Sequence, residues 1–331
     1  MNIIIITAIL IALLFDFLNG MNDAANSIAT VVSTKVLSPL VAVIWAAFFN
    51  FVAVFFFGVH VATTIGKGIV DPAIINEYVI LGALIGSVIW VYTCTHFGLP
   101  ISVSHALIGG LIGPALIKGG TAVLLPAGIT KVLIFIILSP LIGIILGFLI
   151  MVLTMLVFRK TSPRRVDTLF RYLQLVSSAI FSIGHGSNDA QKTMGIITVL
   201  LFSTGNLGPE FQVPTWVIFA CYGSIALGTL SGGWKVIKTL GVGLTNLKPV
   251  QGFCAETAGA ITIIGSTFAG IPVSTTHTIT GSIMGVGMTK GLSSVRWNIA
   301  TNIVLAWVFT IPGTIILSGS IYYLISLFLK I

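Results

Sequence analysis

Apolar runs of about twenty residues recur along the chain, separated by short polar segments. A helix of that length crosses a hydrocarbon core of ~30 Å, whereas barrel strands would be shorter and would alternate apolar and polar residues. The pattern therefore predicts an all-α polytopic membrane protein with about 10–12 transmembrane segments, some of them broken or re-entrant. The expected spans are Ile3–Asn19, Pro39–Ala62, Tyr78–Phe97, Ile101–Ile117, Ile129–Phe158, Leu173–Phe202, Trp216–Trp234, Gly252–Ala269, Val273–Lys290 and Trp297–Leu329.

The composition agrees with a membrane protein. Charged residues make up only 7% of the 331 residues, and hydrophobic residues make up 56%. A soluble domain carries roughly 25% charged residues, so an ordinary water-facing surface is excluded. The net charge of +8 comes mainly from short loops, which is typical of the positive-inside bias and does not indicate a nucleic-acid partner. The sequence has no ATPase-type phosphate loop and no His-Glu-x-x-His motif, so ATP-driven pumping would need another chain. We expect neither an enzyme nor a cofactor.

Polar and helix-breaking residues recur in the same order in the two halves of the chain. Gly20–Ala24 returns as Gly186–Ala190, and Gly98–His105 returns as Gly270–His277, at an offset of about 170 residues. Matches of Asn, Asp, Pro and Ser in one order are much harder to obtain by chance than matches of Leu to Ile. The sequence therefore predicts an internal duplication.

The positive charges indicate how the two copies lie in the membrane. With an odd number of crossings in each half, the copies run in opposite directions. Counted from an outside N-terminus, most Lys and Arg residues then fall on the inner side. We therefore expect two inverted repeats in the cell inner (plasma) membrane, with both termini outside and a basic linker in the cytoplasm. The repeats are residues 1–158 and 173–331, and the linker is residues 159–172.

The first repeated interruption is an Asn-Asp motif. Gly20 and Asn22 are poor helix-interior residues, so the sequence predicts a helix break there. An ionised Asp at the bilayer centre costs about 2.5–3.5 kcal/mol on insertion scales, so Asp23 and Asp189 need partners. A hard cation held by carboxylate, amide and freed backbone oxygens would be such a partner. The amide oxygens would come from Asn22 in the first copy and Asn188 in the second. The alternative is that the two aspartates only cap broken helices.

The second repeated interruption has the pattern Pro-x-Ser-x-Ser/Thr-His, which predicts a helix start. Free N–H groups, hydroxyls and a positive dipole end suit an anion, and two inverted copies could meet around one tetrahedral oxyanion. The alternative is ordinary Ser/Thr capping in both copies. The candidate anion ligands, the last two from the Asn-Asp motifs, are Ser102, Ser104, Ser274, Thr275, Thr276, Asn26 and Gln191.

Four further ionisable residues are candidates for coupling or support. His105 and His277 close the helix-start motifs, and each could hydrogen-bond a backbone carbonyl or touch substrate. Glu256 has no acidic equivalent in the first half and could carry a proton or cation, or hydrogen-bond between helices. Lys192 follows the second Asn-Asp motif, where it could neutralise the aspartate or attract an anion.

The motifs at Gly20–Asn26, Gly186–Lys192, Gly98–Ser102 and Gly270–His277 together resemble the inorganic phosphate transporter (PiT) family, and the resemblance covers nearly the whole chain. It implies cation-coupled phosphate symport, with sodium in some members and protons in others, inverted repeats and a homodimer. Some relatives carry sulfate. The second copy departs from the pattern at Gln191-Lys192, where no Asn corresponds to Asn26, so a symmetric cation site is in doubt. The short linker resembles that of a minimal prokaryotic member.

Taken together, these features predict a secondary transporter in the lipid bilayer that holds phosphate between two helix starts. Its alternatives are proton-coupled symport through Glu256, sulfate transport, a passive anion channel, and a membrane enzyme built on the two histidines. Co-transported sodium is expected on Asn22, Asp23, Asn188, Asp189, Ser102 and Ser274.

Overall fold

The protein is almost entirely helical. The structure is a computed structural model that describes residues 2–330, apart from the side chains of residues 241 and 242, and folds them into twelve α-helices and four short 3-10 helices. The described residues contain no β-strand and a single isolated bridge, between Val70 and Leu124. The predicted all-helical class is confirmed. The 3-10 helices are η1 (Ala53–Phe55), η2 (Pro72–Ile74), η3 (Thr121–Val123) and η4 (Leu292–Ser294).

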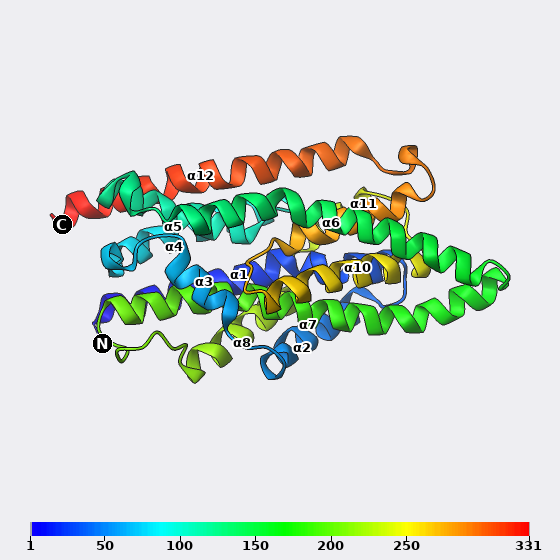
Figure 1. Cartoon of the computed structure of the whole chain (residues 1–331), viewed down its shortest axis with the longest axis horizontal. Helices are drawn as coiled ribbons and strands as arrows, with labels where there is room; N and C mark the ends of the chain where they lie inside the picture. Colours follow the sequence, from blue (N-terminus) through cyan, green and yellow to red (C-terminus); the bar gives the residue numbers. More distant parts are fainter. Residues whose placement is uncertain (1, 331) are drawn as a thin grey trace.

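The same order of helices occurs in each half of the described chain. A long helix comes first, a sharply bent pair follows, and a helix of 33 residues comes last. The helices of the first half are α1 (Ile3–Ser33), α2 (Pro39–Val52), α3 (His60–Gly68), α4 (Glu77–Phe97), α5 (Val103–Gly119) and α6 (Pro126–Phe158). Those of the second half are α7 (Pro163–Ser203), α8 (Thr215–Ser231), α9 (Trp234–Gly243), α10 (Pro249–Phe268), α11 (Thr275–Met288) and α12 (Trp297–Leu329). The chain runs through α1 and α7 in opposite directions (Figure 1).

Several helices are suited to a lipid environment. Four of them, α1, α4, α6 and α12, are long and apolar enough to cross a membrane, and the two bent pairs raise the number to six. Length and composition alone thus qualify fewer spans than the expected total of about 10–12, because the other described helices are shorter or more polar. The long helices expose apolar side chains such as Ile137 and Ile316, which are 71% and 70% exposed. Apolar surfaces of this kind mark contact with lipid.

The predicted helix break at the Asn-Asp motif is wrong in both halves. Helix α1 continues from Ile3 to Ser33, and α7 runs unbroken from Pro163 to Ser203. The glycines of the motif serve close packing instead, since a Cβ at Gly20 would overlap the carbonyl oxygen of Ile225, and one at Gly186 would overlap that of Asn50. The helices therefore keep their own backbone hydrogen bonds, and the motif frees no carbonyl oxygens for a cation.

The actual interruptions lie elsewhere. The pair α2–α3 bends by 84° and the pair α8–α9 by 76°, within stretches that the sequence pattern presents as continuous. The helix starts at α5 and α11 were predicted correctly. Each follows a glycine in the left-handed region, Gly98 (φ 72°) and Gly270 (φ 64°), a conformation that glycine adopts without steric penalty.

The basic linker is mostly helical. Helix α7 begins at Pro163, so the loop that joins it to α6 comprises residues 159–162. The start of α1 and the end of α12 lie at one end of the molecule, and this loop lies at the other (Figure 1). The division into two repeats and a linker stays a prediction.

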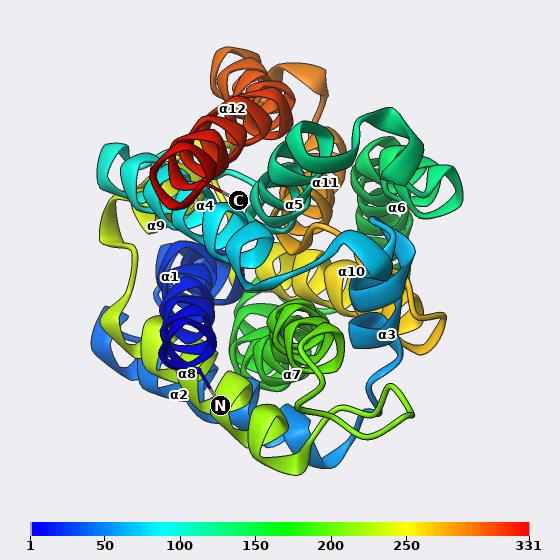
Figure 2. The same cartoon turned by 90° about the vertical axis from the view of Figure 1, so that its left-hand side faces the viewer.

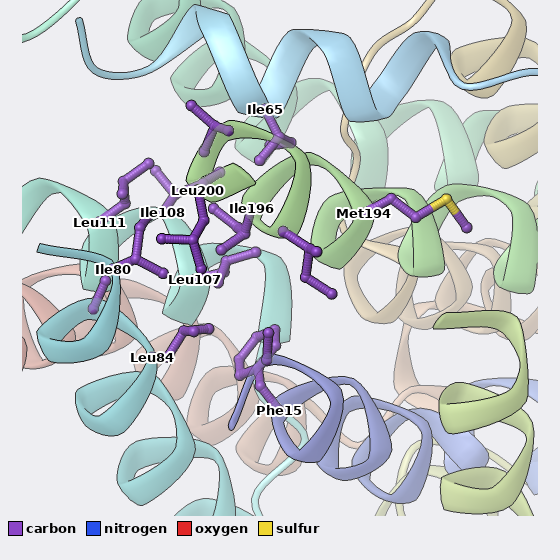
Figure 3. Close-up of a cluster of buried hydrophobic side chains, with 14 of the residues drawn as sticks. Phe15, Ile65, Ile80, Leu84, Leu107, Ile108, Leu111, Met194, Ile196 and Leu200 are labelled. Atoms are coloured by element: carbon purple, nitrogen blue, oxygen red, sulfur yellow. The ribbon is translucent and has the colours of Figure 1, made fainter. Parts of the chain in front are cut away.

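Two apolar cores lie along the helices with a polar layer between them. On α1 the first core ends at Leu18 and the second begins at Ala25. On α7, which runs in the opposite direction, the second core ends at Phe181 and the first begins at Ala190. Figure 3 shows part of the first core, where Phe15 of α1 lies in one cluster with side chains of α4, α5 and α7. The residues between the cores are those of the two Asn-Asp motifs.

Each short helix, α5 or α11, packs against the last helix of the other half. Helix α5 lies along α12, and α11 lies along α6 (Figure 2). Glycines make these contacts close, because a Cβ at Gly109 or Gly113 would overlap α12, and one at Gly281 or Gly285 would overlap α6. Small residues are typical of such contacts, since lipid gives helices no hydrophobic drive to associate. The two helix starts are thereby fixed between the halves.

Replacing Gly20 with Ala should destabilise the protein, because the added methyl group would overlap the backbone of α8. Over-packing of this kind costs about 1–3 kcal/mol. We expect G20A to lose its monodisperse peak in size-exclusion chromatography after heating to a lower temperature than wild type. The matched control is Gly223→Ala, since a Cβ at this helical glycine meets nothing within 4 Å. Equal thermal stability of the two variants would contradict the packing role.

Candidate functional site

The starts of α5 and α11 meet in the interior of the protein. Ser102 accepts a hydrogen bond from the His105 N–H (3.3 Å), and Ser274 accepts one from the His277 N–H (3.2 Å). Both serines thus cap their helices, as the capping alternative expected. The two rings pack edge to face, with centroids 4.7 Å apart, so both helix starts belong to one site.

Hydroxyl groups tie each helix start to the loop before the other. Thr276 of α11 donates to the carbonyl of Ile101 (3.0 Å), and Ser104 of α5 donates to the carbonyl of Val273 (3.4 Å). All four residues are buried. The two contacts repeat one pattern, because each joins a hydroxyl of one copy to the equivalent carbonyl of the other.

The Asn-Asp motif of α1 binds the start of α11. The Asp23 carboxylate lies within hydrogen-bond reach of Thr276 (3.2 Å) and Thr275 (3.4 Å). The single hydroxyl hydrogens of these two threonines are also within reach of the Ile101 carbonyl and of Asp189, respectively. The Asn26 amide donates to the same two hydroxyls, at 3.0 and 3.2 Å. The structure thus brings these predicted residues together and places a carboxylate in direct contact with a helix start.

The asparagines of the two Asn-Asp pairs bind the ends of α4 and α10, the helices that precede α5 and α11. Asn22 donates to Thr95 (2.8 Å) at the end of α4, and Asn188 donates to Thr267 (3.0 Å) at the end of α10. Their carbonyl oxygens differ. That of Asn188 accepts from the Val273 N–H (3.3 Å), whereas that of Asn22 is buried without a hydrogen-bond partner among the described residues. Asn22 therefore retains an acceptor for a cation.

The motif of α7 carries an internal ion pair. Asp189 accepts from Thr275 (3.1 Å) and from the ammonium group of Lys192, one turn further along the helix. Lys192 is only 2% exposed and also donates to Ser104 and to the Val273 carbonyl (2.8 Å). Of the two roles considered for Lys192, neutralisation of Asp189 matches these contacts.

His185 is a site residue that the sequence reasoning missed. Its Nε2 atom lies 3.3 Å from Asp189 and 3.9 Å from Asp23. Its Nδ1 atom lies 3.1 Å from the amide oxygen of Asn50, whose amide nitrogen donates to Thr229 (3.0 Å). With the amide in this orientation the ring proton is on Nδ1, so Nε2 faces two carboxylates with a lone pair unless a proton or a cation lies among them.

The same three side chains could bind a metal ion. Asp23, His185 and Asp189 each offer a ligand atom, and these atoms lie within 4.8 Å of one another. The amide oxygens of Asn22 and Asn26 are buried and lack hydrogen-bond partners among the described residues. Carboxylate and amide oxygens suit a hard cation such as sodium, so the donor set fits a cation on the Asp23 side.

Two predicted site residues lie against other groups. The side-chain oxygen of Gln191 accepts from the backbone N–H groups of Val61 (2.9 Å) and Ala62 (3.4 Å), at the start of α3. Glu256 belongs to a separate cluster, where it accepts from Thr30 (2.6 Å). The side-chain oxygen of Gln191 thus holds the start of α3 in place. The hydrogen bonds that Glu256 forms with the described residues join it to residues other than Asp23.

The remaining predicted residues, His277 and His105, differ in their partners. His277 stacks on Trp307, with ring centroids 3.6 Å apart, and its Nδ1 lies 3.3 Å from the carbonyl oxygen of Ile136. His277 therefore meets the first of the two alternatives, a bond to a backbone carbonyl. The Nδ1 of His105 has no hydrogen-bond partner among the described residues.

Apolar helices that enclose a layer of buried carboxylates, amides and paired helix starts define a membrane transport protein for a small charged solute. The solute is identified by the relatives of the chain. A model described as the phosphate transporter family matches residues 19–318. The chain belongs to the phosphate transporter family, as the sequence resemblance predicted, and this family consists of transporters and not of enzymes.

Individual relatives agree over almost the full length. A probable low-affinity inorganic phosphate transporter of Rhizobium meliloti (strain 1021) is 54% identical over 97% of this chain and 96% of its own. A protein with the same description from Bacillus subtilis (strain 168) is 42% identical over 99% of both chains. A solved structure described as the sodium-dependent phosphate transporter has a TM-score of 0.91 and 25% identity, covering 98% of this chain and 100% of that one.

Replacing Thr276 with Val should impair phosphate transport, because its hydroxyl bonds Asp23, Asn26 and the Ile101 carbonyl. Hydrogen bonds to charged groups contribute about 1.5–3 kcal/mol, so initial uptake of labelled phosphate into proteoliposomes should fall about tenfold or more. Thr280→Val, one turn later in α11, is the control, since the Thr280 hydroxyl has no hydrogen-bond partner among the described residues. Similar uptake by the two variants would contradict the role of Thr276.

Proposed function

We propose that this protein imports inorganic phosphate by symport with sodium ions, through alternating access to the site between α5 and α11. The observation that carries the proposal is the contact of Asp23 with both hydroxyls at the start of α11, Thr275 and Thr276. Through this contact, a candidate cation ligand and a candidate anion site share the same hydroxyl groups. The sodium dependence in the description of the solved relative adds support.

Phosphate would bind at the two helix starts. The hydroxyls of Ser104, Thr275 and Thr276 lie there, and the positive ends of the helix dipoles favour an anion. Ser102 and Ser274 would assist from the cap positions. The hydroxyl groups are donors that can rotate, so they can leave their present acceptors and turn to phosphate oxygens.

Coupling follows from competition for hydroxyl hydrogens. Thr275 and Thr276 donate to Asp23, and a phosphate ion would need the same hydrogens. A sodium ion on Asp23, Asn22 and Asn26 would supply the positive charge that the carboxylate otherwise obtains from these donors. It would also remove the repulsion between carboxylate and phosphate, which is large in a low dielectric. Sodium and phosphate should therefore bind cooperatively.

We also propose that the two halves are inverted repeats that move relative to each other around the site. The opposite directions of α1 and α7 in Figure 1 support this arrangement. The basic residues around the α6–α7 loop favour a cytoplasmic position for that end and an outside position for both termini in the plasma membrane. A homodimer, as the family resemblance implies, completes the proposal.

Uptake of labelled phosphate into proteoliposomes should increase with an inward sodium gradient and fall to background in Asp23→Asn. The amide cannot supply the negative charge that a sodium ion requires, so coupling is lost. Asp189→Asn should have the same effect, since it leaves the buried Lys192 ammonium without its carboxylate. Asp167→Asn is the control, because this carboxylate is half exposed and, within the described part of the chain, forms its ion pair with Arg171.

Four outcomes would redirect the assignment. Uptake that ignores the sodium gradient excludes sodium coupling, and unchanged sodium dependence in both aspartate variants excludes these residues as ligands. Passive anion conductance with no cation dependence indicates a channel. Unlabelled sulfate that competes as well as phosphate indicates a sulfate transporter, because the two tetrahedral anions present similar oxygens.

Proton coupling is the second candidate, and the Glu256 cluster favours it. The carboxylate is fully buried and accepts from Thr30 (2.6 Å), Gln174 (3.0 Å) and Ser177, which are all neutral groups. Ionisable residues inside a membrane commonly belong to proton or ion pathways. Glu256 is therefore the residue through which a proton-coupled cycle would run.

A pH gradient without sodium separates the two coupling modes. Under sodium symport, wild type should accumulate no labelled phosphate in sodium-free proteoliposomes with an acidic exterior. Accumulation that disappears in Glu256→Gln, while binding of labelled phosphate persists, would assign coupling to a proton at this carboxyl. Ser177→Ala is the control, because it removes one hydrogen bond and leaves the ionisable group in place.

A further inference from the structure

Lys192 occupies the position that Asn26 holds in the first half of the chain. The Asn-Asp pairs of α1 and α7 align, and three residues after each Asp come Asn26 and Lys192. The contacts of the two side chains are equivalent as well. The Asn26 amide donates to Thr276 (3.0 Å), and the Lys192 ammonium donates to Ser104 (2.5 Å), its counterpart in the other helix start.

The contacts of the Lys192 ammonium resemble the coordination of a small cation. Its nitrogen bonds three oxygens of different kinds: the carboxylate of Asp189, the hydroxyl of Ser104 and the backbone carbonyl of Val273 (2.8 Å). Carboxylate, hydroxyl and carbonyl oxygens are also the ligands of hard metal cations in proteins. An ammonium group has three N–H donors, so these three partners use all of them.

The first half offers the corresponding ligands without a positive charge. Asp23 receives hydrogen bonds from Thr275 and Thr276 and lies 3.9 Å from His185, a residue that it shares with the second half. The Asn26 amide is neutral, and its oxygen has no hydrogen-bond partner among the described residues. The charge of the second aspartate is thus balanced within the chain, whereas that of Asp23 is left to a bound cation.

We propose that the ammonium group of Lys192 replaces a coupling cation in the second half, so that the transport cycle binds sodium on the Asp23 side only. This inference rests on the proposed sodium symport. If Lys192 replaces one cation, the protein binds one sodium ion fewer per phosphate than it would with a sodium site in each half. The replacement also makes Asp189 and Lys192 a fixed, neutral pair that stays in the protein while sodium and phosphate cross.

The competing role for Lys192 is direct attraction of phosphate. All three donors of the ammonium already bond protein oxygens, so a phosphate contact would have to displace one of them. The two roles differ in what Lys192→Asn does. Loss of a phosphate ligand lowers phosphate affinity at saturating sodium, whereas loss of a replacement cation opens a place for one more sodium ion beside Asp189.

The test is the number of ²²Na⁺ ions bound per chain at saturating phosphate, measured by equilibrium dialysis of purified protein. Lys192→Asn, which installs the first-half residue, should bind one sodium ion more than wild type. The control Asp189→Asn/Lys192→Asn should show no gain, because it lacks the carboxylate. An unchanged sodium number in Lys192→Asn, with binding of labelled phosphate retained, would overturn the inference.

A reciprocal variant and wild type keep the inference testable if Lys192→Asn does not fold. Asn26→Lys should place an ammonium group beside Asp23, as Lys192 does beside Asp189. This variant should bind one sodium ion fewer than wild type, and an unchanged number would count against the proposal. In wild-type uptake, the Hill coefficient for sodium should be about 1, and a value near 2 would contradict sodium binding on one side only. Phosphate uptake that ignores the sodium gradient would instead refute sodium symport, while Lys192→Asn should still gain one bound sodium ion.

Discussion

The arrangement of this protein depends on two carboxylates, Asp23 and Asp189, that are buried between two apolar cores. A buried charge without partners is strongly destabilising, so the surrounding helices must deliver donors or cations to each of them. The hydroxyl of Thr275, at the start of α11, lies within hydrogen-bond reach of both carboxylates. The need to satisfy these charges explains why unbroken helices, polar helix starts and a buried lysine meet at one level of the structure.

The same requirement links stability to transport. A site whose donors already serve protein oxygens binds an anion poorly, because the one hydroxyl hydrogen of Thr276, which is within reach of Asp23 and of the Ile101 carbonyl, cannot serve phosphate as well. Cation binding changes this balance without any new contact to phosphate. In the proposed cycle, the asymmetry between Asn26 and Lys192 would decide how many cations must enter from solution. The two halves of the chain would then perform unequal tasks, since one half brings its positive charge as a side chain.

The sequence was sufficient for the features that depend on composition and order. Long apolar runs predicted the helical membrane class, and repeated Pro-Ser patterns predicted the starts of α5 and α11. It was not sufficient where tertiary contacts override local preference. Gly20 is unfavourable in an isolated helix, yet it is needed because α8 packs against it, a contact with Ile225 that no local pattern reveals. His185 precedes the second motif as Asn19 precedes the first, but its position between two carboxylates depends on the packing of α1 against α7.

The packing of α5 on α12 and of α11 on α6 bears on how such a site could open. Each helix start is connected by sequence to one half and is packed, through its glycines, against the last helix of the other. The glycine contacts are close backbone contacts, so α5 would move with α12 and α11 with α6. The hydrogen bonds between the two starts, Thr276 to Ile101 and Ser104 to Val273, are the bonds that a separation of these two units would break. Ligands that bridge the starts, a phosphate ion with its sodium, would replace those bonds and compensate for their loss, which ties movement of the halves to occupancy of the site.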